Sequence, residues 1–190
     1  MTAYAKASAD EARHIVEEFI DAVFADQEND PFAGRMRSAL PELPESPSDA
    51  QIDAWIELAG LVKDETFRNR VRAMVTAGEQ QPEATDNADT DTAGQAVIEK
   101  ADVAIAAGIA PTAAGSRAVV AELVGMFSTA AGTGDTPTYR AELLRRLEQF
   151  SDRRVDRYWR LIGIINGWPE RPDAFAAYQW FMEALRATLR

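Results

Sequence analysis

The apolar residues of this chain recur at intervals of three and four along almost its whole length, and this spacing most constrains its fold. Between residues 7 and 27, for example, Ile15, Phe19 and Val23 mark one face of an amphipathic helix. Alternation of apolar and polar residues is never sustained, so no strand is expected. We therefore predict an all-α fold of about eight or nine short helices. The further segments with helical spacing are residues 32–40, 48–63, 64–77, 93–107, 112–131, 139–150, 151–166 and 173–185.

Residues that favour helix ends separate these segments. Ser48 precedes Gln51 by three positions, which is the spacing of a capping box. Thr136 followed by proline is typical of a helix start, and Gly108 and Gly167 are typical of helix ends. The residues expected to cap other helices are Asp10, Asp64 and Asp173.

Residues 78–93 differ in composition from the rest of the chain. They contain five acidic residues, no Lys or Arg, and no apolar residue larger than alanine. This composition predicts a solvated linker between an N-terminal helical lobe, residues 1–77, and a C-terminal helical lobe, residues 94–190. The length of the chain allows either one compact domain or two lobes that share an interface.

The composition excludes several classes of protein. There is no cysteine, so disulfides, thiolate metal sites and cysteine nucleophiles are ruled out, as is usual in a reducing cytoplasm. No apolar stretch has the length of a signal peptide core or a membrane span. The net charge of −11 would repel phosphate backbones. We therefore expect a cytoplasmic chain that contacts neither a membrane nor nucleic acid directly.

The sequence offers little for catalysis. His14 is the only histidine, and no Gly-x-Ser-x-Gly turn accompanies it. Glu11 and His14 have the spacing of carboxylate-bridged di-metal sites, but such sites need this pair twice. The loop at residues 132–135 lacks the lysine of a phosphate-binding loop. We expect no enzyme activity, metal or cofactor, and a helical enzyme of unrecognised chemistry remains an alternative.

Two segments of the chain echo each other. The run IDAWIELAGLVKD from Ile52 aligns without gaps on VDRYWRLIGIING from Val155, and this alignment pairs Trp55 with Tyr158. One interpretation is a coincidence between two amphipathic core helices. The other is a true repeat, in which each lobe contributes one aromatic-bearing helix to a shared centre.

The segments SDAQIDAWIELAGLVKDETFRNRVRAM and DRRVDRYWRLIGIINGWPERPDAFAAYQWFMEALRA resemble the C-terminal effector regions of actinobacterial MerR-family transcriptional regulators. The middle segments AAGIAPTAAGSRAVVAELVGMFS and YRAELLRRLEQF are similar to the TipAS-type antibiotic-recognition domain. The resemblance implies a TipAS- or globin-like second half and a domain that binds a small molecule, often an antibiotic or another hydrophobic drug. In such regulators the molecule shifts an attached DNA-binding dimer between two conformations.

The winged helix-turn-helix and the dimerising coiled-coil helix of that family have no counterpart in this sequence. Two interpretations therefore stay open: a sensing domain separated from its regulator, which implies a homodimer through the missing coiled coil, or a stand-alone antibiotic-binding protein that confers resistance by sequestration.

Helix position and aromatic character predict where the small molecule binds. Aromatic rings bury apolar area and, in Trp and Tyr, keep a polar group for a ligand. They gather on the two C-terminal helical segments and on the echoing N-terminal one. The rings predicted to line a ligand cavity are Trp55, Phe127, Tyr158, Trp159 and Trp168, and the predicted polar anchors are Glu57, Arg160 and Asn166.

Overall fold

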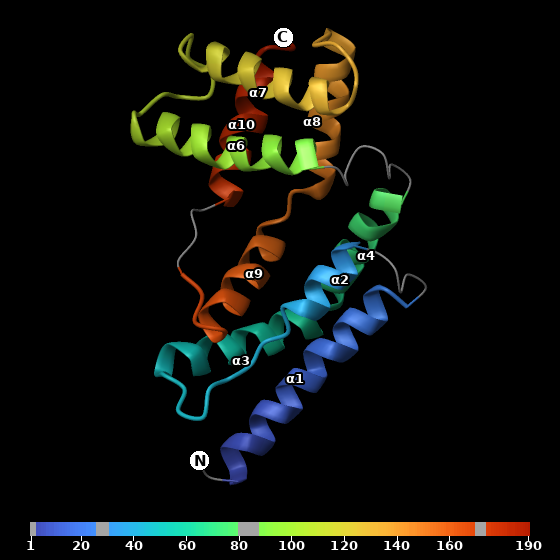
Figure 1. Ribbon diagram of the computed structural model, residues 1–190, viewed down its shortest axis with the longest axis vertical. Coiled ribbons are helices and arrows are strands. Elements are labelled where there is room, and N and C mark those ends of the chain that lie inside the picture. The colour runs from blue at the N-terminus through green and yellow to red at the C-terminus, as the bar shows by residue number, and fades with distance from the viewer. Residues whose placement is uncertain (1–2, 26–30, 80–87, 170–173) are drawn as a thin grey trace. The chain divides into compact units, whose positions relative to one another are not determined.

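The computed structural model describes residues 3–25, 31–79, 88–169 and 174–190 (Figure 1). Within these ranges the backbone forms nine helices and no strand, which confirms the all-α prediction. The helices are α1 (Ala3–Val23), α2 (Pro31–Ser38), α3 (Asp49–Lys63), α4 (Glu65–Glu79), α6 (Ala88–Ala106), α7 (Ser116–Ala130), α8 (Pro137–Phe150), α9 (Arg153–Ile165) and α10 (Ala174–Ala187).

The chain divides into two compact units that do not follow the predicted lobes. The first unit combines Met1–Thr76 with Arg153–Arg171, and the second combines Ala77–Asp152 with Pro172–Arg190. The expected C-terminal lobe, residues 94–190, is therefore not one continuous lobe. The physical reason is that α9 buries its apolar face in the same core as α1, α3 and α4.

The predicted linker is also shorter than its composition indicates. Residues 88–93 form the first turns of α6, and Ala93 is fully buried. Asp89 and Asp91 lie in the first turn, where acidic side chains interact favourably with the helix dipole. At its other end, residues 78 and 79 belong to α4, and residues 80–87 lie outside the described residues.

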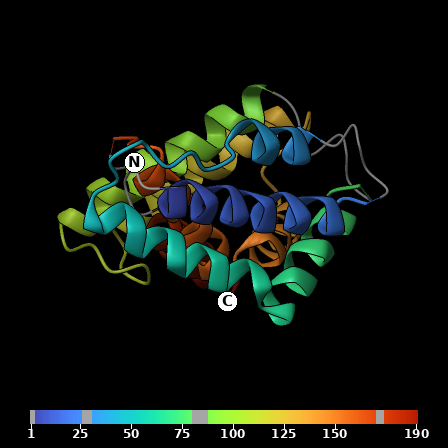
Figure 2. The same cartoon turned by 90° about the horizontal axis from the view of Figure 1, so that it is seen from below.

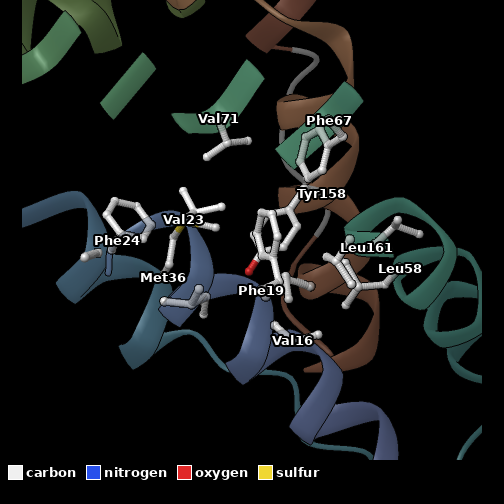
Figure 3. Packing of buried hydrophobic residues seen from close by; sticks show 14 of the residues in the cluster. Val16, Phe19, Val23, Phe24, Met36, Leu58, Phe67, Val71, Tyr158 and Leu161 are labelled. Carbon is white, nitrogen blue, oxygen red and sulfur yellow. The ribbon is translucent and has the colours of Figure 1, made fainter. Parts of the chain in front are cut away.

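The core of the first unit is built around three neighbouring aromatic rings. Phe19 of α1 lies 5.5 Å from Phe67 of α4, measured between ring centroids. Tyr158 of α9 lies 6.0 Å from Phe19 and 6.4 Å from Phe67 (Figure 3). In the same unit α1 runs beside α3 (Figure 2). The rings thus join helices that are far apart in the sequence.

Helices α3 and α9 pack against each other in antiparallel directions. Near the start of α3, the Gln51 side-chain amide donates a hydrogen bond of 2.9 Å to the carbonyl of Ile165, the last residue of α9. Further along α3, Arg157 Nε donates to Glu57 Oε1 at 2.6 Å. These are the two helices that echo each other in sequence, so both echoing helices lie in the first unit. The expectation that each lobe contributes one of them is wrong.

The second unit is arranged around α10, which packs against α6, α7 and α8 (Figure 1). Two of its aromatic side chains make hydrogen bonds to backbone carbonyls. Trp180 Nε1 donates to the carbonyl of Ile109 at 2.8 Å, and the Tyr178 hydroxyl donates to the carbonyl of Gly94 at 3.3 Å. A Cβ at Gly94 would lie only 2.9 Å from the Tyr178 oxygen. Glycine at this position therefore allows α6 to approach α10 closely.

Most of the predicted helix ends are present. Ser48 and Gln51 form the capping box, and Asp64 Oδ1 accepts hydrogen bonds from the backbone of Thr66 at 2.7 Å and of Phe67 at 3.2 Å. Thr136 caps α8, with Pro137 at its first position. The prediction for Asp10 is wrong, because α1 begins at Ala3, and Asp173 lies outside the described residues.

Three helices end in the same glycine motif. Gly108 has a φ of +68°, its amide donates to Ile105, and the amide of Ile109 donates to Ala104. This pattern is a Schellman motif, in which a left-handed glycine satisfies the last carbonyls of the helix. Gly132, which the sequence analysis placed in a loop, and Gly167 repeat it with φ values of +64° and +65°.

The capping box should contribute measurably to the stability of the first unit. Replacing Ser48 with alanine leaves the amide of Gln51 without its side-chain acceptor. We expect Ser48→Ala to lower the free energy of unfolding by about 1 kcal/mol. Urea denaturation followed by tryptophan fluorescence measures this change. Ser46→Ala, two residues earlier and outside the cap, is the matched control and should leave the midpoint unchanged.

Candidate functional site

Two of the predicted ring residues, Trp55 and Tyr158, lie in the core of the first unit. Trp55 is 6% exposed and Tyr158 is 1% exposed, and both belong to the same cluster of buried residues. They occupy equivalent positions in the two echoing helices, α3 and α9. Neighbouring helices therefore direct these two amphipathic side chains into one apolar interior.

The hydroxyl of Tyr158 has no hydrogen-bond partner within the described part of the chain. Its oxygen lies among apolar side chains, near the stacked rings of Phe19 and Phe67 (Figure 3). Burial raises the pKa of Tyr158 far above its ordinary value, because a phenolate in this place would lose its hydration. Tyr158 is therefore a neutral O–H donor, and no described residue accepts its hydrogen bond.

The indole N–H of Trp55 is a second buried donor in this core. Its Nε1 is fully buried, and no described residue accepts its hydrogen bond. Unpaired buried polar groups are rare in folded proteins, and each costs about 1–3 kcal/mol. Trp55 and Tyr158 therefore bring two buried donors, on paired helices, into one core without an acceptor among the described residues.

Trp159 and Trp168 lie nearer the surface of the first unit. Trp159 is partly exposed and makes an edge-to-face contact with Tyr158, at 5.5 Å between ring centroids. Trp168 follows the glycine that ends α9, and its indole covers Gly163, where an added Cβ would lie 3.7 Å from the ring. Both indoles thus border α9, and the ring of Trp159 contacts the Tyr158 ring directly.

The three predicted polar anchors differ in their hydrogen bonds and in their exposure. Glu57 pairs with Arg157, and the hydrogen bond from that guanidinium lowers the pKa of Glu57. Asn166 accepts a hydrogen bond from the backbone of Glu42 at 2.9 Å and donates one to the carbonyl of Leu40 at 3.4 Å. Arg160 is exposed. Glu57 and Asn166 therefore hold the fold together, and their role as ligand anchors stays a prediction.

The fifth predicted ring, Phe127, belongs to the second unit. It is mostly buried and stacks on Phe181, with 6.2 Å between the ring centroids and 14° between the ring planes. It is therefore part of a different core from the other four rings. Sequence periodicity placed it correctly on a buried helix face but not in the cluster to which it belongs.

A cavity in the second unit involves none of the predicted residues. Its volume is about 350 Å³. The guanidinium of Arg140, at its wall, contacts both carboxylate oxygens of Asp135 at 2.6 Å and donates to Thr188 at 3.1 Å. The cavity thus offers no unpaired charge from this arginine. Its lining residues are Asp135, Thr136, Pro137, Arg140, Thr188, Leu189 and Arg190.

A charged residue that was not predicted as a site residue lies on the buried face of α8. Tyr139, Leu143 and Arg146 follow the three-to-four spacing of that face, and Arg146 takes a place where an apolar residue is expected. Both Arg146 Nε and the Tyr139 hydroxyl are buried without a partner. A cation within an apolar stripe is the sequence signal that identifies them.

The only histidine takes part in no metal site in the described ranges. His14 is exposed and lies 3.2 Å from Glu18, one turn further along α1. Among the described residues no three His, Asp or Glu side chains are grouped so that they could hold a metal ion. Over the same residues, no helix combines the length and apolar character needed to cross a membrane.

Comparison with known proteins identifies no relative of this chain. No family model, no curated protein and no solved structure matches the chain. Function is therefore inferred from the contacts and burial of the residues, and first from the two donors of the first unit that lack a described partner.

The unpaired hydroxyl predicts an unusual response to mutation. Tyr158→Phe removes no hydrogen bond, so the free energy of unfolding at neutral pH should stay the same or rise by about 1 kcal/mol. Tyr178→Phe, the matched control in the second unit, removes the bond to Gly94 and should lower it by about 0.5–1.5 kcal/mol. Urea denaturation of both variants measures the difference. A loss in Tyr158→Phe as large as in Tyr178→Phe would contradict the description of an unpaired hydroxyl.

The raised pKa of Tyr158 also predicts how stability depends on pH. Its contribution is complete below the ordinary tyrosine pKa of about 10, and is lost as the pH rises, because only the unfolded state releases the proton. In Tyr158→Phe the stability should fall less steeply at alkaline pH. The difference amounts to at most about 1.4 kcal/mol per pH unit. Denaturant midpoints at a series of alkaline pH values give the two slopes, and equal slopes would contradict the prediction.

Proposed function

We propose that this chain is a small-molecule-sensing effector domain of a MerR-like transcriptional regulator, and that the first unit holds its ligand. The observation that carries the proposal is the unpaired hydroxyl of Tyr158 in the aromatic core, together with Trp55 Nε1 in the same core. The likeness of residues 48–74 and 152–187 to such effector regions supports the same role.

The chemistry of the two atoms defines the class of ligand. An indole N–H is a donor only, and a neutral phenol that lacks a partner has a proton to donate. The surrounding side chains are apolar and aromatic. The matching molecule is flat and largely apolar, and it carries an acceptor such as a carbonyl oxygen.

The aromatic stack explains how binding would be sensed. The rings of Phe19, Phe67 and Tyr158 are in contact, so a ligand reaches the Tyr158 hydroxyl only if they separate. They come from α1, α4 and α9, and their separation must shift these helices. A ligand that binds only the separated arrangement favours it at the expense of the closed one.

In this role the domain works in the cytoplasm and contacts no nucleic acid itself. Its net charge of −11 would repel a phosphate backbone. A helix-turn-helix partner, outside these 190 residues, supplies the contact with DNA.

A screen of antibiotics and other flat drugs tests the proposal. A compound that binds only the folded chain at 100 times its dissociation constant adds about 2.7 kcal/mol of stability. We expect at least one compound to raise the melting temperature by several degrees and to change the tryptophan fluorescence. Both responses should weaken in Tyr158→Phe and in Trp55→Phe.

Tyr178→Phe is the control for this screen, because its hydroxyl lies in the second unit and is already bonded. It should keep the full response. The proposal fails if no compound raises the melting temperature, or if the compounds that do so act equally on Tyr158→Phe, Trp55→Phe and the unmodified chain.

A further inference from the structure

We propose that the second unit contains a separate binding site for an organic monocarboxylate, formed by Arg146 and Tyr139 of α8. No residue of this site belongs to the aromatic core of the first unit, so the inference does not depend on the function proposed above. It rests on two buried donors, one of them charged, that lack an acceptor.

Arg146 is unusual in its place on the helix. Tyr139, Leu143 and Leu144 are the buried residues of α8, and Arg146 lies two turns from Tyr139 on the same side. A guanidinium is charged at every physiological pH, so burying part of it without a counter-ion is costly.

The guanidinium of Arg146 lacks a carboxylate partner within the described ranges. Its Nε is buried and makes no hydrogen bond, although the side chain as a whole is partly exposed. The central carbon of the guanidinium lies 5.8 Å from the ring centroid of Tyr139. Such a cation–π contact is worth about 0.5–2 kcal/mol and provides no acceptor for the buried Nε–H.

The hydroxyl of Tyr139 is the second donor. Tyr139 is 8% exposed, and no described residue accepts the proton of its buried hydroxyl. Burial raises the pKa of Tyr139, and the guanidinium of Arg146, through its charge and its approach to the Tyr139 oxygen, lowers it by less, so the hydroxyl stays protonated at neutral pH. Arg146 and Tyr139 thus place a positive charge beside a hydroxyl whose proton has no acceptor in the described part of the chain.

The other charges of α8 show why the missing acceptor is a single carboxylate. Arg140 is neutralised by Asp135, and Glu148 by Arg186. Glu142 lies one turn from Arg146 and acts on Tyr139 as a negative charge, so it would repel a doubly charged phosphate more than a carboxylate.

The planar shape of a carboxylate matches a guanidinium, which binds it through two parallel hydrogen bonds. The buried neighbours of α8 are apolar, which favours a carboxylate attached to an apolar body.

Sodium benzoate is the probe that tests the site, with binding measured by calorimetry and by the melting temperature of the full chain. Benzoate should bind and raise the melting temperature, while benzyl alcohol, sodium phosphate and sodium chloride at equal ionic strength should not. Arg146→Met should weaken benzoate binding by at least about tenfold, the usual effect of losing a charged hydrogen bond. Tyr139→Phe, which keeps the shape of the ring, should weaken it by about threefold.

Arg145→Met is the matched control, because it removes the same charge from an exposed neighbour, which donates a hydrogen bond to Gln149 at 3.2 Å. It should leave benzoate binding unchanged. Tyr158→Phe should also leave it unchanged, because Tyr158 lies in the core of the first unit and not in this site. The proposal is overturned if benzoate does not bind, if phosphate or benzyl alcohol binds as tightly, or if Arg145→Met has the same effect as Arg146→Met. It is also overturned if Tyr139→Phe and Arg146→Met both fold and bind benzoate as the unmodified chain does.

Discussion

The packing of α9 against α3 is the interaction on which the rest of the first unit depends. It brings residues 153–165 back to a core that the first 76 residues leave incomplete. Because α10 then returns to the second unit, the chain passes between the units three times. Neither core is complete until a late part of the chain is in place, and contacts of such long sequence separation slow folding. Cutting the chain at the acidic stretch would therefore remove α9 from its partners rather than release two intact lobes.

Sequence reasoning succeeded where the physics is local. The capping box of Ser48, the Thr136 cap and the glycine ends at Gly108 and Gly167 depend on residues within one or two turns, and all are present. The apolar stripes identified which face of each helix is buried, but a stripe does not specify its partner. For that reason the sequence placed α9 in the wrong lobe. One of the two interpretations of the echo made α3 and α9 a link between lobes, whereas the two helices pack together in the first unit.

The same limit applies to the candidate site. Helical spacing placed Trp55 and Tyr158 on the apolar faces of their helices, and both lie in one buried core. That they line a ligand cavity stays a prediction. Whether a buried N–H or O–H finds an acceptor depends on the backbone of other helices, which the sequence does not reveal. Tyr178 and Tyr158 illustrate this: the first donates to the carbonyl of Gly94, while the second, with the same spacing of apolar neighbours, has no acceptor. Arg146 was detectable in principle, because a cation in an apolar stripe can be seen in the sequence.

Both proposed sites follow from one argument about unpaired donors. Each such donor costs about 1–3 kcal/mol, which is a large part of the roughly 5–15 kcal/mol by which a protein is stable. Phenylalanine at residue 158 or a long apolar side chain at residue 146 would fill similar space without that cost. The donors nevertheless differ in charge: those of the first unit are neutral and lie among aromatic rings, whereas the second unit combines a hydroxyl with a guanidinium. The two proposed ligands differ for this reason: the first unit is proposed to bind a neutral acceptor and the second an anion.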